Sequence, residues 1–499
     1  MESTADIPHA DPVPWWWKCA VVASAAVWVV LYLPYALGLQ PYFMFDSGWA
    51  LSTNAILQDG LIPTRDFAYI YGLLTLSIDR VWFAVFGATP QAQAALSLVC
   101  VAAVTWATIQ FATAMRLRFA GRLLLLGYAP LAIIPWFFPT PAHALEAALL
   151  ANAIALQARG RNAAALVLVT TCLFVKPALA AVYGPILVGL ILFAPGQHSW
   201  RSRFMKLLPA IATGIAIVVL LTWQYGIAPL IATLLPTEAG KIYKAEDYGF
   251  FSAIGQSFWL PNLDNGLYSP FAPAGFWVLG TIVAVVGAVR AFRQGRGIPA
   301  AVVITCVALH LVFIFLVFGN ASSWKYYTYI LGFAIAATID RAGLPDGDSK
   351  PASNRIAIWL TVLAVMCQAD QLLICVSIFP SAAPPTETAG LYASPDDTAF
   401  WIHVREIAKR ERVLVLCPVS AAHEIFPEVD SPRVWCLVHQ VLRPEEVTRV
   451  RAQIQAADVL VIPLGQTQIA EWSEFKPDCQ AFQVVEKHPT FHLARRIKR

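Results

Sequence analysis

Residues 45 to 72 contain Phe45-Asp46-Ser47-Gly48-Trp49, then Gly60-Leu61-Ile62-Pro63-Thr64-Arg65-Asp66-Phe67, and finally Tyr71-Gly72. These stretches place carboxylates and a guanidinium directly after an apolar segment at residues 19–38, which is long enough to cross a bilayer. Charged groups that lie at a membrane surface, beside a lipid phase, suggest chemistry on a lipid-borne substrate.

The composition is that of a polytopic membrane protein. Of 499 residues, 58% are hydrophobic and 13% charged, the mean hydropathy is +0.61, and 17 Trp can anchor the membrane interfaces. These values exclude a soluble globular domain. The net charge of +4 comes without a basic run, which argues against nucleic-acid binding. The first apolar segment lacks a small-residue cleavage site, so we expect an uncleaved span.

Hydrophobic segments predict eleven spans, at roughly residues 19–38, 92–115, 123–138, 143–158, 163–176, 178–194, 207–226, 271–290, 298–318, 326–340 and 356–379. The run from Leu73 to Phe86 is too short to cross and carries Asp79-Arg80 at its centre, so we expect it in the interface with these two charges paired. The fifth and sixth spans meet at Lys176-Pro177, which predicts a bent pair whose apex points outward.

The distribution of basic residues predicts the orientation. The loops on the side of the N-terminus hold 15 Lys and Arg and the opposite loops six, counted before residue 380. By the positive-inside rule the N-terminus is cytoplasmic, and an odd number of spans then places the C-terminal segment in the periplasm. We therefore expect a multi-pass protein of a bacterial inner membrane.

The chain divides into three expected parts. Residues 1–379 form a transmembrane module with two large outer loops, 39–91 and 227–270, and residues 380–397 are a linker rich in Pro, Ala and Thr. Residues 398–499 predict a small α/β domain outside the membrane. Within that domain we expect helices at 398–412 and 444–457 and strands at 413–416, 434–438 and 459–462.

Together these features resemble the GT-C superfamily of integral-membrane glycosyltransferases, which includes protein O-mannosyltransferases and lipid A aminoarabinose transferases. The motifs that carry the resemblance are Asp46 after the first span, G-x-x-P-x-x-D-F at 60–67, Tyr71-Gly72 and Val85-Phe86-Gly87. Weaker matches are Lys176-Pro177, Trp324-Lys325-Tyr326-Tyr327, and the Trp401-Ile402 helix before Arg412-Val413-Leu414-Val415. The family often has two adjacent acids in the first loop, whereas here Ser47 follows Asp46.

The resemblance implies a polytopic α-helical fold and a transferase that takes a sugar from a polyprenyl-phosphate carrier at the outer face. It implies that Asp46 is the general base. An acceptor hydroxyl that attacks the anomeric carbon needs a carboxylate to take its proton, and a single displacement inverts the configuration. The alternative is that Asp46 caps a helix from Trp49 to Leu57, with Trp49, Thr53 and Ile56 toward the bilayer.

Cations are needed to stabilise the phosphate that stays on the lipid, and Lys176, Lys325 and Arg65 are the candidates. For Lys176 the alternative partner is a backbone carbonyl or an acid, because a buried ammonium requires a partner. Lys325 can instead anchor the interface. We expect three further substrate contacts, at Asp66, Tyr71 and Tyr326, although Asp66 can equally pair with Arg65 or form a turn.

His143 and Glu146 lie one helical turn apart and could hold a divalent metal; the alternative is a helix-start acid that the macrodipole stabilises. No cofactor is firmly implied. Cys417 and Cys436 lie in neighbouring expected strands and could pair in an oxidising periplasm, which would leave Cys479 unpaired.

The predicted function is transfer of a sugar from a polyprenyl-phosphate carrier to a cell-envelope glycan, lipid or protein, with membrane lipids as further partners. Two alternatives stay open. Intramembrane charges also line the pathways of transporters and flippases, here of lipid-linked sugars. The same scaffold could also serve a non-catalytic envelope assembly protein. The C-terminal domain would cover the site or position the acceptor.

Overall fold

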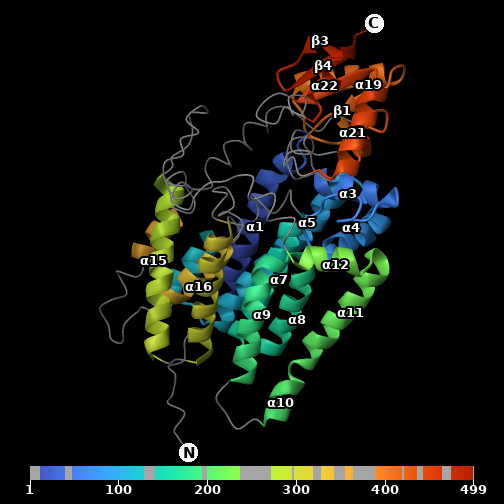
Figure 1. Cartoon of the computed structure of the whole chain (residues 1–499). Coiled ribbons are helices and arrows are strands. Elements are labelled where there is room, and N and C mark those ends of the chain that lie inside the picture. The colour runs from blue at the N-terminus through green and yellow to red at the C-terminus, as the bar shows by residue number, and fades with distance from the viewer. Residues whose placement is uncertain are drawn as a thin grey trace, which may run out of the picture.

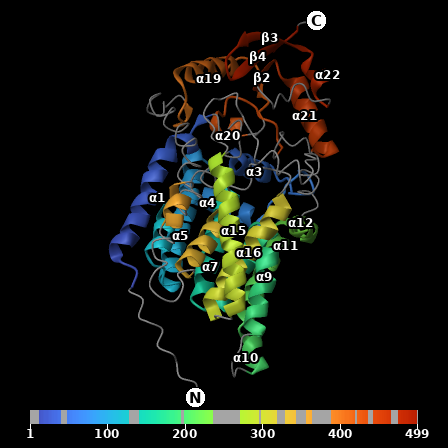
Figure 2. The ribbon, with the colours of Figure 1, turned by 90° about the vertical axis from the view of Figure 1, so that its left-hand side faces the viewer.

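The computed structural model describes residues 12–39, 48–127, 141–193, 199–235, 271–294, 297–317, 328–341, 355–362, 388–417, 421–434, 442–463 and 474–497. Figure 1 shows a bundle of long helices with a smaller part, which contains the strands, above one end of it. The first helix begins at the end of the bundle that is remote from this smaller part, and a view turned by 90° shows the same arrangement (Figure 2).

The long bundle helices follow the apolar segments of the sequence. They are α1 (Trp15–Ala36), α5 (Pro90–Ala114), α7 (Pro141–Ala158), α8 (Asn162–Val175), α9 (Pro177–Leu192), α11 (Leu208–Tyr225), α15 (Phe271–Gln294), α16 (Gly297–Val317) and α17 (Thr328–Arg341). Each lies within four residues of an expected span at both ends. The short helix α10 (Trp200–Met205) leads into α11, and residues 119–127 and 355–362 are also helical.

Among the described helices, three are long and apolar enough to cross a membrane: α1, α5 and the α10–α11 unit. The others are shorter apolar helices of 10 to 17 residues in the parts described. Much of the expected spans at 123–138 and 356–379 lies outside the described residues. The presence of apolar spanning helices is therefore confirmed, and the count of eleven stays a prediction.

Three helices lie at the end of the bundle that faces the strands: α3 (Trp49–Gln58), α4 (Leu73–Phe86) and α12 (Ile227–Leu234). Helix α4 coincides with the short run that the sequence places in the interface. One of its faces is buried, with Leu73 and Phe83, and the opposite face exposes Val81 and Val85 by 66% and 69%. This two-sided pattern is that of a helix that lies along a surface.

The C-terminal part is built on a four-stranded mixed sheet of order β1-β2-β4-β3. Strands β1 (Val413–Val415) and β2 (Val459–Pro463) pair in parallel, and β4 (Phe491–Arg496) pairs antiparallel with both β2 and β3 (Phe482–Lys487). The helices of this part are α19 (Pro395–Ala408), α20 (Ala422–Ile425), α21 (Pro444–Ala456) and α22 (Lys476–Cys479). The sequence predicted β1, β2, α19 and α21, and it missed the β3–β4 hairpin. The expected strand at 434–438 lies almost entirely outside the described residues.

Helices cover both faces of this sheet because its strands are apolar on both sides. Val413, Val415 and Leu493 pack in one cluster with Trp401 of α19. On the other face, Leu414 of β1 and Leu460 of β2 pack with Val450 and Ile454 of α21 and with Cys479 of α22. The α19 cluster does not end at the sheet: it continues without a break into Trp49, Phe67 and Tyr69 of the first loop.

Backbone hydrogen bonds also join the C-terminal part to the end of the first bundle helix. Leu39 N donates to Tyr392 O at 2.8 Å, and Tyr392 N donates to Leu37 O at 2.8 Å. Helix α19 begins at Pro395, so the described end of the expected linker is already ordered against the bundle.

Candidate active site

Lys176 lies at the break between α8 and α9. It is both the C-cap residue of α8 and the N-cap residue of α9, and its backbone is extended, with φ −156° and ψ 107°. Pro177 takes the first position of α9, where its missing N–H costs nothing. The two helices pack side by side (Figure 1). The bent pair that the sequence predicts at Lys176-Pro177 is confirmed, and its turn brings the ammonium to the loop-bearing end of the bundle.

The Lys176 ammonium is held by two side chains of the first turns of α7. Its Nζ donates to His143 Nδ1 at 2.8 Å and lies 3.3 Å from Glu146 Oε2. The side chains of His143 and Glu146 are 8% and 1% exposed, and that of Lys176 is 16% exposed. A carboxylate buried to this degree requires a cation beside it. The acid partner, which the sequence left as an alternative for Lys176, is therefore the one observed.

Tyr71 completes this group, which we call the Lys176 cluster: Tyr71, His143, Glu146 and Lys176. Lys176 Nζ lies 5.9 Å from the centroid of the Tyr71 ring, within reach of a cation–π contact. The Tyr71 ring meets the His143 ring edge to face, with centroids 5.8 Å apart, and lies 6.0 Å from the Trp49 ring. Two predicted substrate contacts, Tyr71 and Lys176, are thus neighbours although 105 positions separate them.

Gly72 allows this approach of the first loop to the helix break. Its N–H donates to Val175 O at 2.9 Å, and Thr75 Oγ1 donates to the same oxygen at 3.2 Å. A Cβ at position 72 would lie 1.9 Å from Phe174 O, which no side chain can tolerate. The aromatic-Gly pair therefore has a steric reason: the aromatic ring reaches the Lys176 cluster only because the next residue has no side chain.

Arg65 and Asp66 pair with one another. Arg65 Nε donates to Asp66 Oδ1 at 3.0 Å and Nη2 to Oδ2 at 2.8 Å, while Ile62 N donates to Oδ2 at 2.8 Å. These bonds lower the pKa of Asp66, chiefly through the Arg65 guanidinium. Thr64, at φ +60°, turns the chain directly before this pair. The ion-pair and turn-forming alternative for Asp66 is the arrangement observed; neither residue contacts the Lys176 cluster.

The N-terminal half of α21 and its N-cap residue bind residues 65–68 of the first loop through hydrogen bonds. The sequence did not predict this contact. Arg443 Nη1 donates to Arg65 O at 3.0 Å, Arg449 Nη2 donates to Asp66 O at 2.9 Å, and Glu446 Oε2 accepts from Ala68 N at 3.1 Å. The same Glu446 oxygen accepts from Arg443 N at 3.0 Å. The spacing of three residues placed Arg443, Glu446 and Arg449 on one helix face, but nothing in the sequence named the surface they meet.

One expectation about the first loop is wrong, and so is one part of the alternative interpretation of Asp46 as a helix cap. Asp79 is 5% exposed and Arg80 is exposed, so they do not pair; successive residues of a helix point in different directions. Burial raises the pKa of Asp79 to about 7. Trp49, Thr53 and Ile56 do not face the bilayer, because α3 is buried on nearly all sides, against α4, α5 and α20. The residue that caps α3 is Gly48.

Three predicted site residues lie outside the described residues: Asp46, Lys325 and Tyr326. Most of the loop at 227–270 and Cys436 also lie outside them, so the expected pairing of Cys417 with Cys436 stays a prediction. Cys417 and Cys479 are buried.

The residues at His143 and Glu146 do not fit a metal site. Among the described residues no third His, Cys, Asp or Glu joins this pair, and the Lys176 ammonium already contacts both side chains. A divalent cation would have to displace that ammonium. The pair therefore positions a cation of the chain itself.

No protein-family model and no curated protein matches this sequence. Solved structures do. The crystal structure of ArnT from Cupriavidus metallidurans bound to undecaprenyl phosphate superposes with a TM-score of 0.51 and 12% identity, over 96% of this chain and 98% of that chain. The same protein in the apo state gives a TM-score of 0.38 and 12% identity, over 95% and 97% of the two chains. The cryo-EM structure of arabinofuranosyltransferase AftD from Mycobacteria gives 0.44 and 14%, over 98% of this chain and 40% of that chain.

The likeness to ArnT extends over nearly the full length of both chains, so it concerns the whole architecture and not one helical segment. This chain therefore has the overall fold of ArnT, a mostly helical fold of the kind that the sequence resemblance implied.

Proposed function

We propose that this protein is a glycosyltransferase of the GT-C type that moves a sugar from a polyprenyl-phosphate carrier to a cell-envelope acceptor at the periplasmic face. One observation carries the proposal: the Lys176 ammonium is fixed at a helix break, beside Tyr71 of the loop that follows the first span. The fold likeness supports it, since the ArnT structure of that fold is bound to undecaprenyl phosphate.

In this proposal Lys176 binds the phosphate of the donor lipid. The ammonium is only 16% exposed and borders the apolar end of the bundle, where a phosphate without a cation would be costly. Glu146 and His143 orient the ammonium before the donor arrives. When the sugar leaves, negative charge grows on the phosphate, and a cation already in place stabilises that charge without reorganisation.

Asp46 is proposed as the general base that takes the proton of the acceptor hydroxyl. It precedes α3 by three positions, and α3 leads through the loop to Tyr71. A single displacement with this base inverts the anomeric configuration. Lys325 and Tyr326 precede α17 and are proposed as further contacts to phosphate and sugar. Arg65 and Asp66, which pair with each other under α21, are proposed to shape the acceptor side rather than to bind phosphate.

The C-terminal part, residues 398–499, is proposed as a periplasmic domain that fixes the first loop and positions the acceptor. Its contacts to Arg65, Asp66 and Ala68 support this role.

The test is donor cleavage by the purified protein in lipid. A panel of polyprenyl-phosphate sugars is incubated with envelope extract as acceptor, and release of polyprenyl phosphate is compared for wild type, Asp46→Asn and Asp396→Asn. Asp396 is an exposed acid of α19 and serves as the matched control. We expect release that is lost in Asp46→Asn and kept in Asp396→Asn. Release that survives in Asp46→Asn would move the base elsewhere, and no release from any donor would favour transport or envelope assembly.

A further inference from the structure

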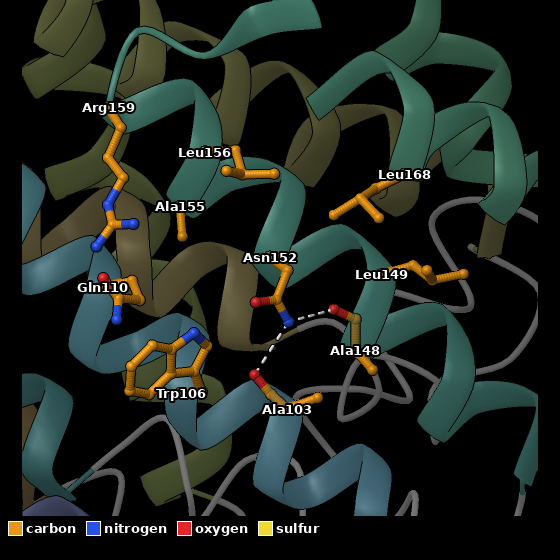
Figure 3. A pocket seen from close by; sticks show the side chains of 10 residues that line it. All are labelled: Ala103, Trp106, Gln110, Ala148, Leu149, Asn152, Ala155, Leu156, Arg159 and Leu168. Atoms are coloured by element: carbon orange, nitrogen blue, oxygen red, sulfur yellow. Dashed lines mark hydrogen bonds between the residues drawn. The ribbon is translucent and has the colours of Figure 1, made fainter. Parts of the chain in front are cut away.

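A cavity of about 340 Å³ lies between α5, α7 and α8, away from the Lys176 cluster. Figure 3 shows the ten residues that line it: Ala103, Trp106, Gln110, Ala148, Leu149, Asn152, Ala155, Leu156, Arg159 and Leu168. Ala148, at the near end of the cavity, is two positions from Glu146 on α7, whereas Arg159 is 13 positions beyond Glu146, or about 20 Å along the helix axis. This volume lies in the range of about 300 to 1,000 Å³ that small-molecule sites occupy.

The cavity is polar on one side and apolar on the other. In Figure 3 the Arg159 guanidinium, the Gln110 amide and the Trp106 ring lie along one wall, and Leu149 and Leu168 form the opposite wall. Arg159 follows the last residue of α7 and is exposed. The lining is therefore amphipathic, with its single positive charge at the end of the helix, where a span meets water.

Asn152 fixes the middle of the cavity. Its Nδ2 donates to Ala103 O at 3.0 Å and to Ala148 O at 2.8 Å, so it links α5 to α7. In Figure 3 the amide oxygen points away from both of these bonds, toward the side of Gln110. With both donors used by the backbone, this oxygen and the Gln110 amide are the polar groups that a ligand would meet below Arg159.

The cavity opens on a surface that a bilayer would cover. Trp106 is 58% exposed, and Val99, two turns earlier on α5, is 54% exposed. Since α5 is apolar and long enough to span a membrane, these exposed apolar side chains would face lipid. In the part of the chain that the structure describes, no carboxylate pairs with Arg159. An unpaired guanidinium at a lipid boundary attracts the anionic headgroups of that leaflet.

We propose that this cavity binds one anionic glycerophospholipid of the bilayer, with the phosphate on Arg159 and an acyl chain along Leu149 and Leu168. A water-soluble anion would contact Arg159 but would leave the apolar wall uncovered. A zwitterionic lipid such as phosphatidylcholine would cover the wall, but its choline ammonium would offset the phosphate charge beside Arg159. A lipid with an anionic headgroup covers the apolar wall and also brings a net negative charge to Arg159.

The test is native mass spectrometry of the purified, delipidated protein, titrated with phosphatidylglycerol or with phosphatidylcholine of the same acyl chains. We expect one phosphatidylglycerol to bind more tightly than the rest. Arg159→Gln should weaken that first binding about fivefold, since a basic residue near the membrane surface contributes about 1 kcal/mol. Arg161→Gln is the matched control, because Arg161 is exposed two positions later but does not line the cavity.

Ala103→Trp provides a second variant, which fills the cavity from α5 and keeps Arg159. It should remove the first binding event while phosphatidylglycerol adsorbed elsewhere stays, and size-exclusion chromatography must show that it is still monodisperse. Equal affinity for the two lipids would overturn the proposal, as would equal losses in Arg159→Gln and Arg161→Gln. Displacement of the bound lipid by undecaprenyl phosphate at equal concentration would also overturn it, because the occupant would then be a carrier lipid.

Discussion

At the residue scale, the Lys176 and Glu146 pair is the feature on which the proposed site depends. Each charge is acceptable at the end of an apolar bundle only because the other is there. The pair joins the break between α8 and α9 to the start of α7, and so it fixes three helix ends at once. Asp79 offers a contrast: one of its oxygens is buried without a hydrogen bond among the described residues, and burial raises its pKa to about 7.

We expect Lys176→Met to lower the free energy of unfolding by about 3 kcal/mol, because it leaves a buried carboxylate without its cation. Adding Glu146→Gln to Lys176→Met should recover most of this loss, since the charge is then gone. The midpoint of thermal unfolding in detergent measures both effects. Lys206→Met, at an exposed position before α11, should change the midpoint little. A double variant as unstable as the single one would show that side-chain packing, and not the Lys176–Glu146 ion pair, stabilises these helix ends.

At the scale of elements, the first loop is held from two sides, by the break between α8 and α9 below and by α21 above. Gly72 lets the loop approach the helix break closely, and the Glu446 carboxylate accepts a hydrogen bond from Ala68 N. Neither contact is local in sequence. The two contacts together position the first loop. Without them, the turn at Thr64 would have to hold the shape of the loop.

Gly72→Ala should displace the loop from the helix break, because the new Cβ would lie 1.9 Å from Phe174 O. We expect a loss of about 1–3 kcal/mol in the free energy of unfolding, the usual cost of overpacking, and a loss of donor turnover beyond the change in stability. Gly189→Ala in α9 is the control, because a Cβ there meets nothing within 4 Å. That change should be neutral or slightly stabilising, as alanine favours helix. Equal behaviour of the two variants would contradict the steric role of Gly72.

Glu446 predicts a pH dependence. Burial raises its pKa above the ordinary 4.5, although the Arg443 and Ala68 N–H groups oppose the shift. A raised pKa in the folded state means that the protonated form is favoured there, so its contribution to stability is present below pH 4.5 and is lost as pH rises through the folded pKa. Glu446→Gln keeps an oxygen acceptor and does not titrate.

We therefore expect Glu446→Gln to gain thermal stability relative to wild type as the pH rises from about 4 to 7. The measurement is the unfolding midpoint of the two proteins across that range, with the exposed neighbour in Glu445→Gln as the control. A constant difference between Glu446→Gln and wild type at every pH would contradict the prediction, because it would show that folding leaves the pKa of Glu446 unchanged.

At the scale of the whole molecule, the C-terminal part and the first loop share one hydrophobic cluster. Trp401 is fully buried at its centre, with its ring 5.1 Å from Phe426 and 5.3 Å from Phe491. The same hydrophobic cluster includes Trp49 and Phe67, which belong to the loop that carries Tyr71 of the Lys176 cluster. The two parts are therefore expected to lose stability together.

Trp401→Ala should lower the free energy of unfolding by about 3–5 kcal/mol, through the cavity it leaves. It should also speed hydrogen exchange in residues 48–72, although position 401 is more than 300 residues away along the chain. Trp223→Ala is the control, because the Trp223 side chain is 81% exposed. Faster exchange confined to residues 395–497 would show that the two parts unfold independently.

Apolar runs fixed most of the bundle helices because a spanning helix must satisfy its own backbone and present apolar side chains, so length and composition suffice. The break at Lys176-Pro177, the short helix at Leu73–Phe86 and the pair β1–β2 were visible for similar local reasons. Strand β3 was missed because most of its side chains are exposed, so it lacks a strand-like alternation.

What surrounds each charge was decided only by the tertiary structure. The sequence marked Lys176 as needing a partner, but the partners come from a helix that begins 35 positions earlier, and pairing across that distance depends on how helices pack. The Asp79-Arg80 pairing failed because neighbours in sequence point apart on a helix. Helix α3 is buried against α4, α5 and α20, and α21 binds the first loop through residues 378 positions from Ala68. Contacts of this kind between separate elements leave no periodic pattern in a single chain.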